Sequence, residues 1–296
     1  MRINTGEPIP FTVVGGFLGA GKTTLVNALL RQAAGLRLAV LVNDFGSIAI
    51  DAALIESSTG DTIALTNGCI CCAIGDDFAA GIEAMLRRRP TPDHILVEAS
   101  GVANPGAIAQ IALLDPDLTL AGVLVLADAE SLPARLADPR LGDTLRRQLR
   151  AADLLVLTKT DLAPAGPVLA TLRALAPQAA IVEGADLPLA IALGHHAQAG
   201  PRPSGHGVAF ATVTLHPSRP LATATLRLAL DALPEGVLRA KGLLCLDGRP
   251  ALVQRVGRRL AITACDAPVE EALVLIGDDT VWDAAAALAA LGLERR

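Results

Sequence analysis

The chain has 296 residues, of which 52% are hydrophobic and 2% aromatic, and its formal net charge is −5. This length is enough for one large domain, or for a medium and a small domain, with a largely aliphatic core. The negative charge gives no general support for nucleic-acid binding, and the basic run Arg87–Arg89 is typical of a solvated helix end. No segment has about 18 uninterrupted apolar residues, and the N-terminus lacks a signal-peptide pattern. We therefore expect a cytoplasmic protein without a membrane span.

The first two-thirds of the chain alternate short apolar stretches with helical patterns. The predicted strands are Ile9–Val14, Leu38–Val42, Thr62–Leu65, His94–Val97, Gly122–Leu126, Leu154–Leu157 and Ala180–Val182. Helical patterns fall at about 22–34, 76–89, 104–114, 142–151 and 167–176. Most of the strands are almost wholly apolar, as strands buried on both faces should be. This order predicts an α/β fold with a mostly parallel sheet, helices on both of its faces, and ligand sites at the carboxyl ends of its strands.

A smaller α+β domain is predicted after residues 195–207, where Gly, Pro and Ser interrupt every periodic pattern. We therefore divide the chain into a first domain at 1–194, a linker at 195–207 and a second domain at 208–296. The elements predicted in the second domain are a strand at Val208–Leu215, a helix at Ala222–Leu233, strands within Lys241–Cys265 that turn at Asp247-Gly248, a strand at Ala272–Ile276 and a helix at Asp279–Leu293. The linker region contains His195, His196 and His206, which could be accessory metal ligands, although histidines in a solvated loop more often have no specific role.

A phosphate-binding pattern lies near the N-terminus. Residues Gly16–Thr23 match G-x-x-x-x-G-K-[ST] without a mismatch, between a predicted strand and a predicted helix. Backbone N–H groups of such a loop and of the following helix N-terminus converge on phosphate oxygens. Lys22 would add positive charge near the β- and γ-phosphates, and Thr23 would place its hydroxyl on Mg²⁺. The residues predicted to contact the phosphates and the metal here are Gly16, Gly19, Ala20, Gly21, Lys22, Thr23 and Thr24.

A base-reading motif, Thr158-Lys159-Thr160-Asp161, directly follows a predicted buried strand. The Asp161 carboxylate could accept hydrogen bonds from the ring N–H and the exocyclic amine of guanine. Adenine lacks this pair of donors, so a buried, unpaired carboxylate would reject ATP. The Lys159 stem could pack over the base. We therefore expect Thr158, Lys159 and Asp161 on the base side of a GTP site.

Two further strand ends carry acidic residues. Glu98 could hold Mg²⁺ directly or through water, and the alternative is that its carboxylate caps the next helix. Gly101 could donate its N–H to the γ-phosphate and so sense hydrolysis. Asp44 is a candidate for positioning water or facing the metal. Lys22, Asp44 and Glu98 are the candidate catalytic residues.

Three of the five cysteines crowd into Cys69, Cys71 and Cys72. Thiolates are soft ligands that suit zinc or monovalent copper. In an extended backbone Cys69 and Cys71 point the same way, and Cys72 joins them only if the chain turns. Inert buried cysteines remain an alternative, as does redox chemistry at the C-x-x-C spacing of Cys69 and Cys72.

Together these residues resemble the CobW-like GTPases, relatives of the nickel-inserting urease and hydrogenase maturation GTPases. The resemblance covers almost the whole chain, and the Cys-x-Cys-Cys segment between the phosphate loop and the base-reading motif is specific to this family. The matching segments are Gly16–Thr24, Asn43–Gly46 with Asp51 after it, Gly68–Cys72, Glu98–Pro105, Thr158–Asp161 and Arg239–Gly242.

The resemblance implies a P-loop NTPase domain followed by a small C-terminal domain. It also implies slow GTP hydrolysis coupled to binding and delivery of a metal, most often zinc, with cobalt in the cobalamin branch. In this reading Thr23 holds Mg²⁺, and Cys69, Cys71 and Cys72 bind the delivered ion. The chain departs from the family pattern at Asp44, where relatives often have glutamate, and the linker has scattered histidines instead of a dense tract.

The sequence therefore predicts a cytoplasmic GTPase metallochaperone that uses GTP, Mg²⁺ and Zn²⁺ or Co²⁺. GTP and Mg²⁺ would order the loops around Asp44 and Glu98, and hydrolysis would loosen the thiolate site and pass the ion to a metal-requiring client protein. Two alternatives remain: a P-loop ATPase or small-molecule kinase, and a non-catalytic metal store or sensor. Self-association as a homodimer is left open.

Overall fold

The computed structural model describes residues 8–33, 35–43, 62–65, 76–184, 187–193, 211–264, 271–278 and 280–295. The chain divides into two compact units, Met1–Pro177 with Ile181–Pro203, and Gln178–Ala180 with Ser204–Arg296. Residues 195–207, which the sequence predicts to be a linker, lie outside the described residues. Within the described ranges, no helix has both the length and the apolar character needed to cross a membrane.

The first unit is built on a seven-stranded sheet in the order β3-β2-β4-β1-β5-β6-β7. Its strands are β1 (Ile9–Gly16), β2 (Leu38–Asn43), β3 (Thr62–Leu65), β4 (His94–Glu98), β5 (Leu118–Asp128), β6 (Leu154–Thr158) and β7 (Ala180–Glu183). The recorded pairings from β3 across to β6 are all parallel. The predicted α/β class with a mostly parallel sheet is therefore confirmed.

The strands at the middle of this sheet are buried on both faces. Every residue of β4 and of β6 is buried, and β1 has one half-buried residue, Pro10. This burial explains why these segments are nearly continuous apolar runs in the sequence. The sequence underestimated β5 at both ends, and its extra residues bring Asp128 to the carboxyl end of the strand.

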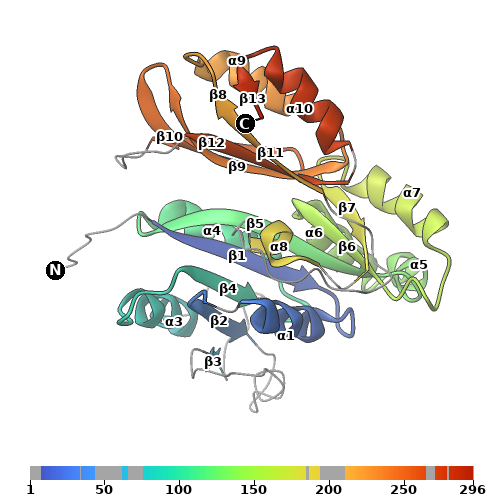
Figure 1. Cartoon of the computed structure of the whole chain (residues 1–296). Coiled ribbons are helices and arrows are strands. Elements are labelled where there is room, and N and C mark those ends of the chain that lie inside the picture. Colours follow the sequence, from blue (N-terminus) through green and yellow to red (C-terminus); the bar gives the residue numbers. More distant parts are fainter. Residues whose placement is uncertain are drawn as a thin grey trace. The chain divides into compact units, whose positions relative to one another are not determined.

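Helices cover the sheet of the first unit. They are α1 (Lys22–Gln32), α3 (Asp76–Leu86), α4 (Pro105–Leu114), α5 (Leu132–Ala137), α6 (Gly142–Arg150), α7 (Ala165–Leu175) and α8 (Leu189–Leu193). Figure 1 shows α1 on one side of β1, with α4 and α6 on the other. The sequence missed α5 and α8, because six and five residues are too few for a helical period to stand out.

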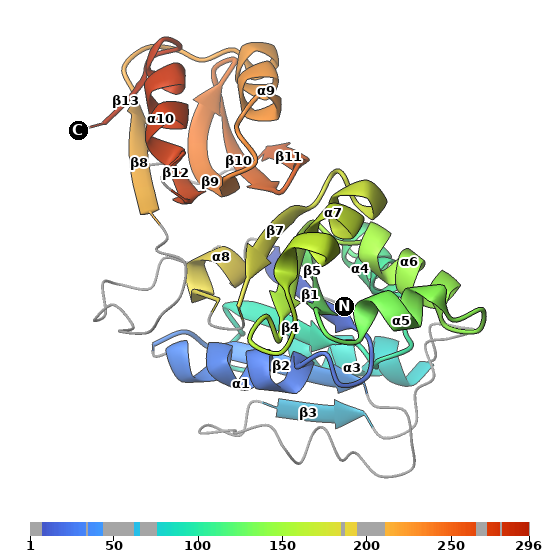
Figure 2. The ribbon, with the colours of Figure 1, turned by 90° about the vertical axis from the view of Figure 1, so that its right-hand side faces the viewer.

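The second unit is a six-stranded sheet in the order β11-β10-β9-β12-β8-β13, with two helices (Figure 2). Its elements are β8 (Ala211–Pro217), α9 (Thr223–Asp231), β9 (Val237–Leu246), β10 (Arg249–Val256), β11 (Arg259–Ala264), β12 (Ala272–Gly277), α10 (Val281–Ala289) and β13 (Leu293–Glu294). The recorded pairings are antiparallel. The predicted hairpin is confirmed: β9 and β10 meet at Asp247 and Gly248, whose φ angles are +50° and +78°.

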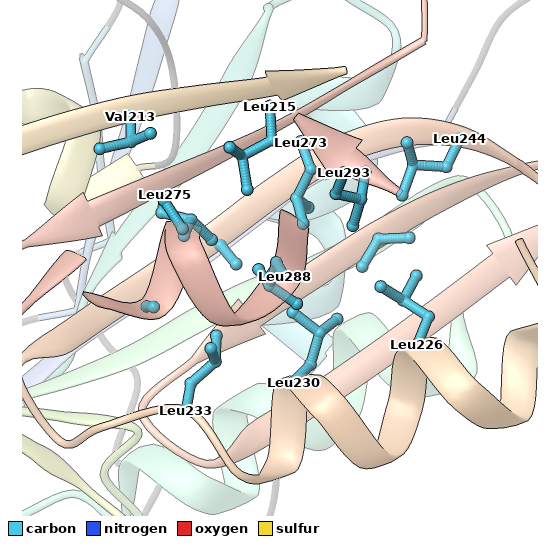
Figure 3. Packing of buried hydrophobic residues seen from close by; sticks show 14 of the residues in the cluster. Val213, Leu215, Leu226, Leu230, Leu233, Leu244, Leu273, Leu275, Leu288 and Leu293 are labelled. Atoms are coloured by element: carbon cyan, nitrogen blue, oxygen red, sulfur yellow. The ribbon is translucent and has the colours of Figure 1, made fainter. Parts of the chain in front are cut away.

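Leucines from both helices and the sheet form the core of the second unit. Leu226 and Leu230 of α9 and Leu288 of α10 are at most 1% exposed. Figure 3 shows them packed toward strand leucines such as Leu215 and Leu273. Because both helices lie on one face of the sheet (Figure 1), this unit has two layers and a single apolar interior.

The predicted end of the last helix is wrong. The helix was expected to run to Leu293, but α10 ends at Ala289, and Leu293 and Glu294 pair with β8. Gly292 has a φ of +88°, which ends the helical path, and its carbonyl accepts a 2.7 Å hydrogen bond from the Ser218 N–H. The alanine-rich pattern could not reveal this stop, which depends on a partner strand more than 70 residues earlier.

Candidate functional site

The phosphate loop connects β1 to α1 in the arrangement that the motif predicts. Gly16 ends β1 with a φ of +134°, and a Cβ there would lie 2.7 Å from the Leu126 carbonyl oxygen. Only glycine fits this position, where the end of β1 lies against Leu126 of the neighbouring strand β5. Gly19 and Gly21 also have positive φ angles, and Gly21 is the N-cap of α1. The loop therefore turns sharply and leads into the N-terminus of a helix, as anion binding requires.

Lys22 and Thr23 occupy the first turn of α1. Lys22 is 7% exposed, and its Nζ donates to the Phe17 carbonyl at 3.4 Å, so the side chain folds back over the loop. The Thr23 hydroxyl donates to Glu98 Oε1 at 2.9 Å. Thr24 is exposed on the same turn. The Lys22 ammonium group and the oxygens of Thr23 and Glu98 thus lie beside the loop, where phosphates are expected.

Glu98 reaches this position because β4 lies next to β1 in the sheet. Val14 pairs with Glu98, so the carboxylate leaves the sheet beside the start of the phosphate loop. Glu98 is only 2% exposed, so its charge is buried beside Thr23. The alternative role as a helix cap is wrong, because α4 is capped by Asn104, whose Oδ1 accepts from the Gly106 N–H at 3.0 Å.

The loop that follows β4 packs directly on the phosphate loop. A Cβ on Gly101 would lie 2.5–2.8 Å from the side chain and backbone nitrogen of Leu18, so only glycine allows this approach. The Gly101 and Ala103 carbonyls accept hydrogen bonds from Gln148 at 3.1 and 2.8 Å. The two loops that were expected to surround the terminal phosphate are therefore in contact through Leu18 and Gly101.

The base-reading motif lies at the end of β6 and is joined to the phosphate loop. The buried Thr158 hydroxyl donates to the Ala20 carbonyl at 3.0 Å. Lys159 has a φ of +58°, and its Nζ forms an ion pair with Asp128 Oδ2 at 2.7 Å. Asp161 is exposed. Thr158 thus supports the loop backbone, and the Lys159 head is fixed while its stem remains partly exposed.

Asp128 is a site residue that the sequence reasoning missed. It pairs with Thr158 across β5 and β6, and its carboxylate also accepts from the Ser131 hydroxyl at 2.8 Å and from the Glu130 N–H at 3.0 Å. Burial alone would raise its pKa, but hydrogen bonds from Lys159, Ser131 and Glu130 outweigh that effect and lower the pKa. The predicted strand ends at Leu126; a strand extended to Asp128 would have marked this acidic residue at its carboxyl end as a candidate.

Arg135 of α5 is a second contact that no motif indicated. Its Nη1 donates to the Leu18 carbonyl at 2.9 Å, and its guanidinium carbon lies 4.9 Å from the centre of the Phe17 ring. Arginine over an aromatic ring is an attractive arrangement. Arg135 therefore holds Phe17 and Leu18, the first two of the four variable positions of the phosphate loop, from outside the motif.

Several predicted site residues lie outside the described residues. They are Asp44, the cysteines Cys69, Cys71 and Cys72, and the histidines His195, His196 and His206. Within the described ranges, no group of three or more His, Cys, Asp or Glu side chains is arranged to hold a metal ion. The metal site predicted at the cysteines therefore rests on the sequence alone. The geometry of the described residues concerns the predicted nucleotide site.

A family model for the CobW/HypB/UreG nucleotide-binding domain matches residues 10–183. The chain belongs to this family. A second model, for the C-terminal domain of the cobalamin synthesis protein cobW, matches residues 210–291. The resemblance stated from the motifs is therefore confirmed, and the CobW nucleotide-binding domain includes the phosphate loop, Glu98, Asp128 and the base-reading motif.

Curated relatives of this CobW-family chain include two zinc chaperones. The zinc chaperone CobW of Pseudomonas aeruginosa is 33% identical over 88% of this chain and 83% of its own length. The zinc chaperone CobW of a Sinorhizobium species is 38% identical, but the match covers 54% of this chain and 53% of that relative. The zinc-regulated GTPase metalloprotein activator 1 of Schizosaccharomyces pombe is 37% identical over 54% of this chain and 41% of its own. The chain thus spans about half the length of some relatives and most of another.

Proposed function

We propose that this protein is a GTP-hydrolysing metallochaperone. It would bind a thiophilic divalent metal, with zinc as the first candidate and cobalt as the second, and deliver it to a client protein that needs the metal. The observation that carries the nucleotide half is the 2.9 Å contact between the Thr23 hydroxyl and the buried Glu98 carboxylate, directly after the phosphate loop. The names of the relatives support the metal half.

The residues at the loop fit a nucleoside triphosphate with Mg²⁺. Mg²⁺ prefers oxygen ligands, and Thr23 and Glu98 supply a hydroxyl and a carboxylate to one point beside the helix N-terminus. When bound, the ion would neutralise charge on the phosphates. Lys22 would exchange its contact with the Phe17 carbonyl, which is long at 3.4 Å, for the phosphates. Gly101 would donate its N–H to the terminal phosphate.

Base selection would belong to Asp161 and Lys159. The Asp161 carboxylate is exposed, so it stays hydrated until a base binds. Guanine would then supply two hydrogen-bond donors to it. The Lys159 head stays on Asp128, so its apolar stem can cover the base without losing the ion pair. Adenine in the same place would leave the carboxylate desolvated and unpaired.

The cargo site would be formed by Cys69, Cys71 and Cys72. Three thiols within four positions suit zinc, and an incomplete ligand set suits transfer better than permanent storage. Asp44 would work with Lys22 and Glu98 in hydrolysis. We further propose that the protein acts in the cytoplasm and that a homodimer is one form in which it could meet its client.

Two measurements test this function. First, binding and hydrolysis of GTP and ATP are compared in the wild type and in Lys22→Ala. We expect a strong guanine preference and a large loss of hydrolysis in the variant. Equal binding of ATP would favour an ATPase or small-molecule kinase, and unchanged turnover in Lys22→Ala would remove the support for an enzyme.

Second, zinc is titrated in the presence of GDP and of a non-hydrolysable GTP analogue. Unequal zinc affinities are required, since a ligand can shift only an equilibrium whose states it binds differently. Equal affinities would contradict coupled delivery and favour a metal store. Cys71→Ser should weaken zinc binding, whereas the matched variant Cys245→Ser, at a half-buried free cysteine of β9, should not.

A further inference from the structure

A buried glutamine on α6 contacts the loop that was expected to sense the terminal phosphate. The inward face of α6 carries Leu145, Gln148 and Leu149, and Gln148 is only 1% exposed. Its Nε2 donates to the Ala103 carbonyl at 2.8 Å and to the Gly101 carbonyl at 3.1 Å. A buried amide is costly unless it forms hydrogen bonds, so these two bonds define what the side chain does.

The orientation of this amide follows from its two partners. Both partners are carbonyl oxygens, so only the NH₂ end of the side chain can face them, and a flipped amide would place Oε1 against two acceptors. Among the described residues, Gln148 Oε1 is buried and has no hydrogen-bond partner. The side chain is thus specialised for donating both protons of one nitrogen to the loop.

Gln148 holds both sides of a tight turn. The Ala103 N–H donates to the Ser100 carbonyl at 3.0 Å, which closes a turn that contains Gly101. Glycine is the residue whose backbone is otherwise the freest to rotate. Because the Gly101 carbonyl is held toward α6 and Leu18 lies against its Cα, the remaining freedom of Gly101 is small.

We propose that Gln148 is a positioning residue for the terminal phosphate of GTP. It holds the Gly101 turn in advance, so that the Gly101 N–H meets the γ-phosphate without first paying the cost of ordering the backbone. This inference rests on the proposed function. It goes further in naming the residue that distinguishes a nucleoside triphosphate from a diphosphate, since GDP has no phosphate for this turn to contact.

The test compares Gln148→Met with a control, Gln32→Met. Methionine keeps the length and the apolar stem and removes both donors. Gln32, at the end of α1, also forms two main-chain bonds, to the Leu187 carbonyl at 3.2 Å and from the Leu189 N–H at 3.0 Å. It lies at the other end of α1, about 15 Å along the helix from Lys22. Gln32 is exposed and Gln148 is buried, so Gln32→Met should cost less stability. It controls for the loss of two main-chain bonds away from the Gly101 turn.

Affinities for GDP and for a non-hydrolysable GTP analogue are measured by calorimetry with Mg²⁺. In Gln148→Met we expect the analogue to bind about tenfold more weakly and GDP to change less than twofold. Gln32→Met should leave the ratio of the two affinities unchanged. A purely structural role would weaken both nucleotides alike, so an unchanged ratio in Gln148→Met overturns the proposal.

A measurement on the wild type keeps the proposal testable if Gln148→Met does not fold. Backbone hydrogen exchange in residues 99–105 should be slower with the analogue than with GDP, and equal exchange would overturn the proposal. If the wild type binds neither nucleotide, the proposed function fails as well. If the wild type binds both and only the Gln148 result is negative, this inference alone fails.

Discussion

The ion pair between Lys159 and Asp128 should contribute measurably to stability, and Asp128→Asn tests its contribution. Asparagine keeps the shape and one carbonyl oxygen, so the contacts that Oδ1 makes with Glu130 and Ser131 can remain. Its nitrogen replaces Oδ2, which accepts from Lys159 Nζ at 2.7 Å and from the Ser131 hydroxyl at 2.8 Å. The hydroxyl can rotate and accept from the amide instead. The variant therefore loses a charge-assisted bond and places two donors against each other.

The magnitude follows from the burial of the two partners. The Asp128 side chain is 3% exposed and that of Lys159 is 35% exposed, so solvent screens the lysine partly. A hydrogen bond to a charged group contributes about 1.5–3 kcal/mol, and we discount this for the exposed partner to about 1–2 kcal/mol. Urea denaturation of the wild type and the variant measures this difference. The matched control is Asp143→Asn, which removes an ion pair between Asp143 and Arg146. The Asp143 side chain is 85% exposed, so this substitution should cost almost no stability.

The same variant predicts a pH dependence. Folding lowers the pKa of Asp128, so the ionised carboxylate stabilises the folded state above the pKa of an unfolded aspartate, about 4. This contribution is lost as the pH falls through the lowered pKa of the folded state. The stability difference between wild type and Asp128→Asn should be full at pH 7 and shrink below about pH 4. A difference that is absent at pH 7, or that grows on acidification, would refute the reasoning.

Three further substitutions test the supports of the fold and the site. Arg135→Ala removes the bond to the Leu18 carbonyl and the contact with the Phe17 ring, so GTP affinity measured by calorimetry should fall about tenfold; an unchanged affinity would contradict a role in holding the loop. Thr158→Val keeps the side-chain shape but leaves the Ala20 carbonyl without its 3.0 Å bond, and should cost about 1–2 kcal/mol in thermal unfolding together with weaker GTP binding. Leu230→Ala in the core of the second unit should cost about 2–4 kcal/mol in urea, whereas Leu228→Ala on the same helix, at a side chain that is 73% exposed, should cost less than about 1 kcal/mol; similar losses would show that the core is misplaced.

The parts of the site that follow from local rules could be predicted from sequence. The phosphate loop is a contiguous motif whose glycines and helix start are fixed by backbone geometry, so Gly16 and Lys22 needed no knowledge of the rest of the chain. Glu98 could be expected there because parallel strands bring their carboxyl ends to one edge. The sequence could not reveal its partner, because helix capping and metal binding were equally consistent with it. The structure removes the first alternative, since Asn104 caps α4, and it pairs Glu98 with Thr23; metal binding by Glu98 stays a prediction.

The contacts from α5 and α6 could not be predicted, for a physical reason. Arg135 binds a carbonyl 117 residues away, and Gln148 binds carbonyls 45 and 47 residues away. Main-chain carbonyls are present at every residue, so no residue type at the far end marks the pairing. Gln148 was within a predicted helix, but a glutamine on an apolar helix face indicates a buried partner without identifying it.

Two neighbouring helices, α5 and α6, support the phosphate loop and the Gly101 turn from outside the phosphate-binding motif. Arg135 holds the phosphate loop from α5, and Gln148 holds the Gly101 turn from α6. The helices are themselves joined closely, because the Arg146 guanidinium donates to the Leu136 carbonyl at 3.0 Å and a Cβ on Gly142 would lie 2.6 Å from that same oxygen.

The phosphate loop, α5, α6 and the Gly101 turn each contact the next, and the Gly101 turn contacts the phosphate loop again, since Leu18 lies against Gly101. A shift of the Gly101 turn therefore cannot be absorbed locally: either Leu18 moves with it, or the bond to α6 breaks. Packed interfaces change between discrete arrangements more readily than they deform continuously. We therefore expect nucleotide affinity to depend on the packing of α5 against α6, although neither helix contains a residue of the phosphate-binding pattern.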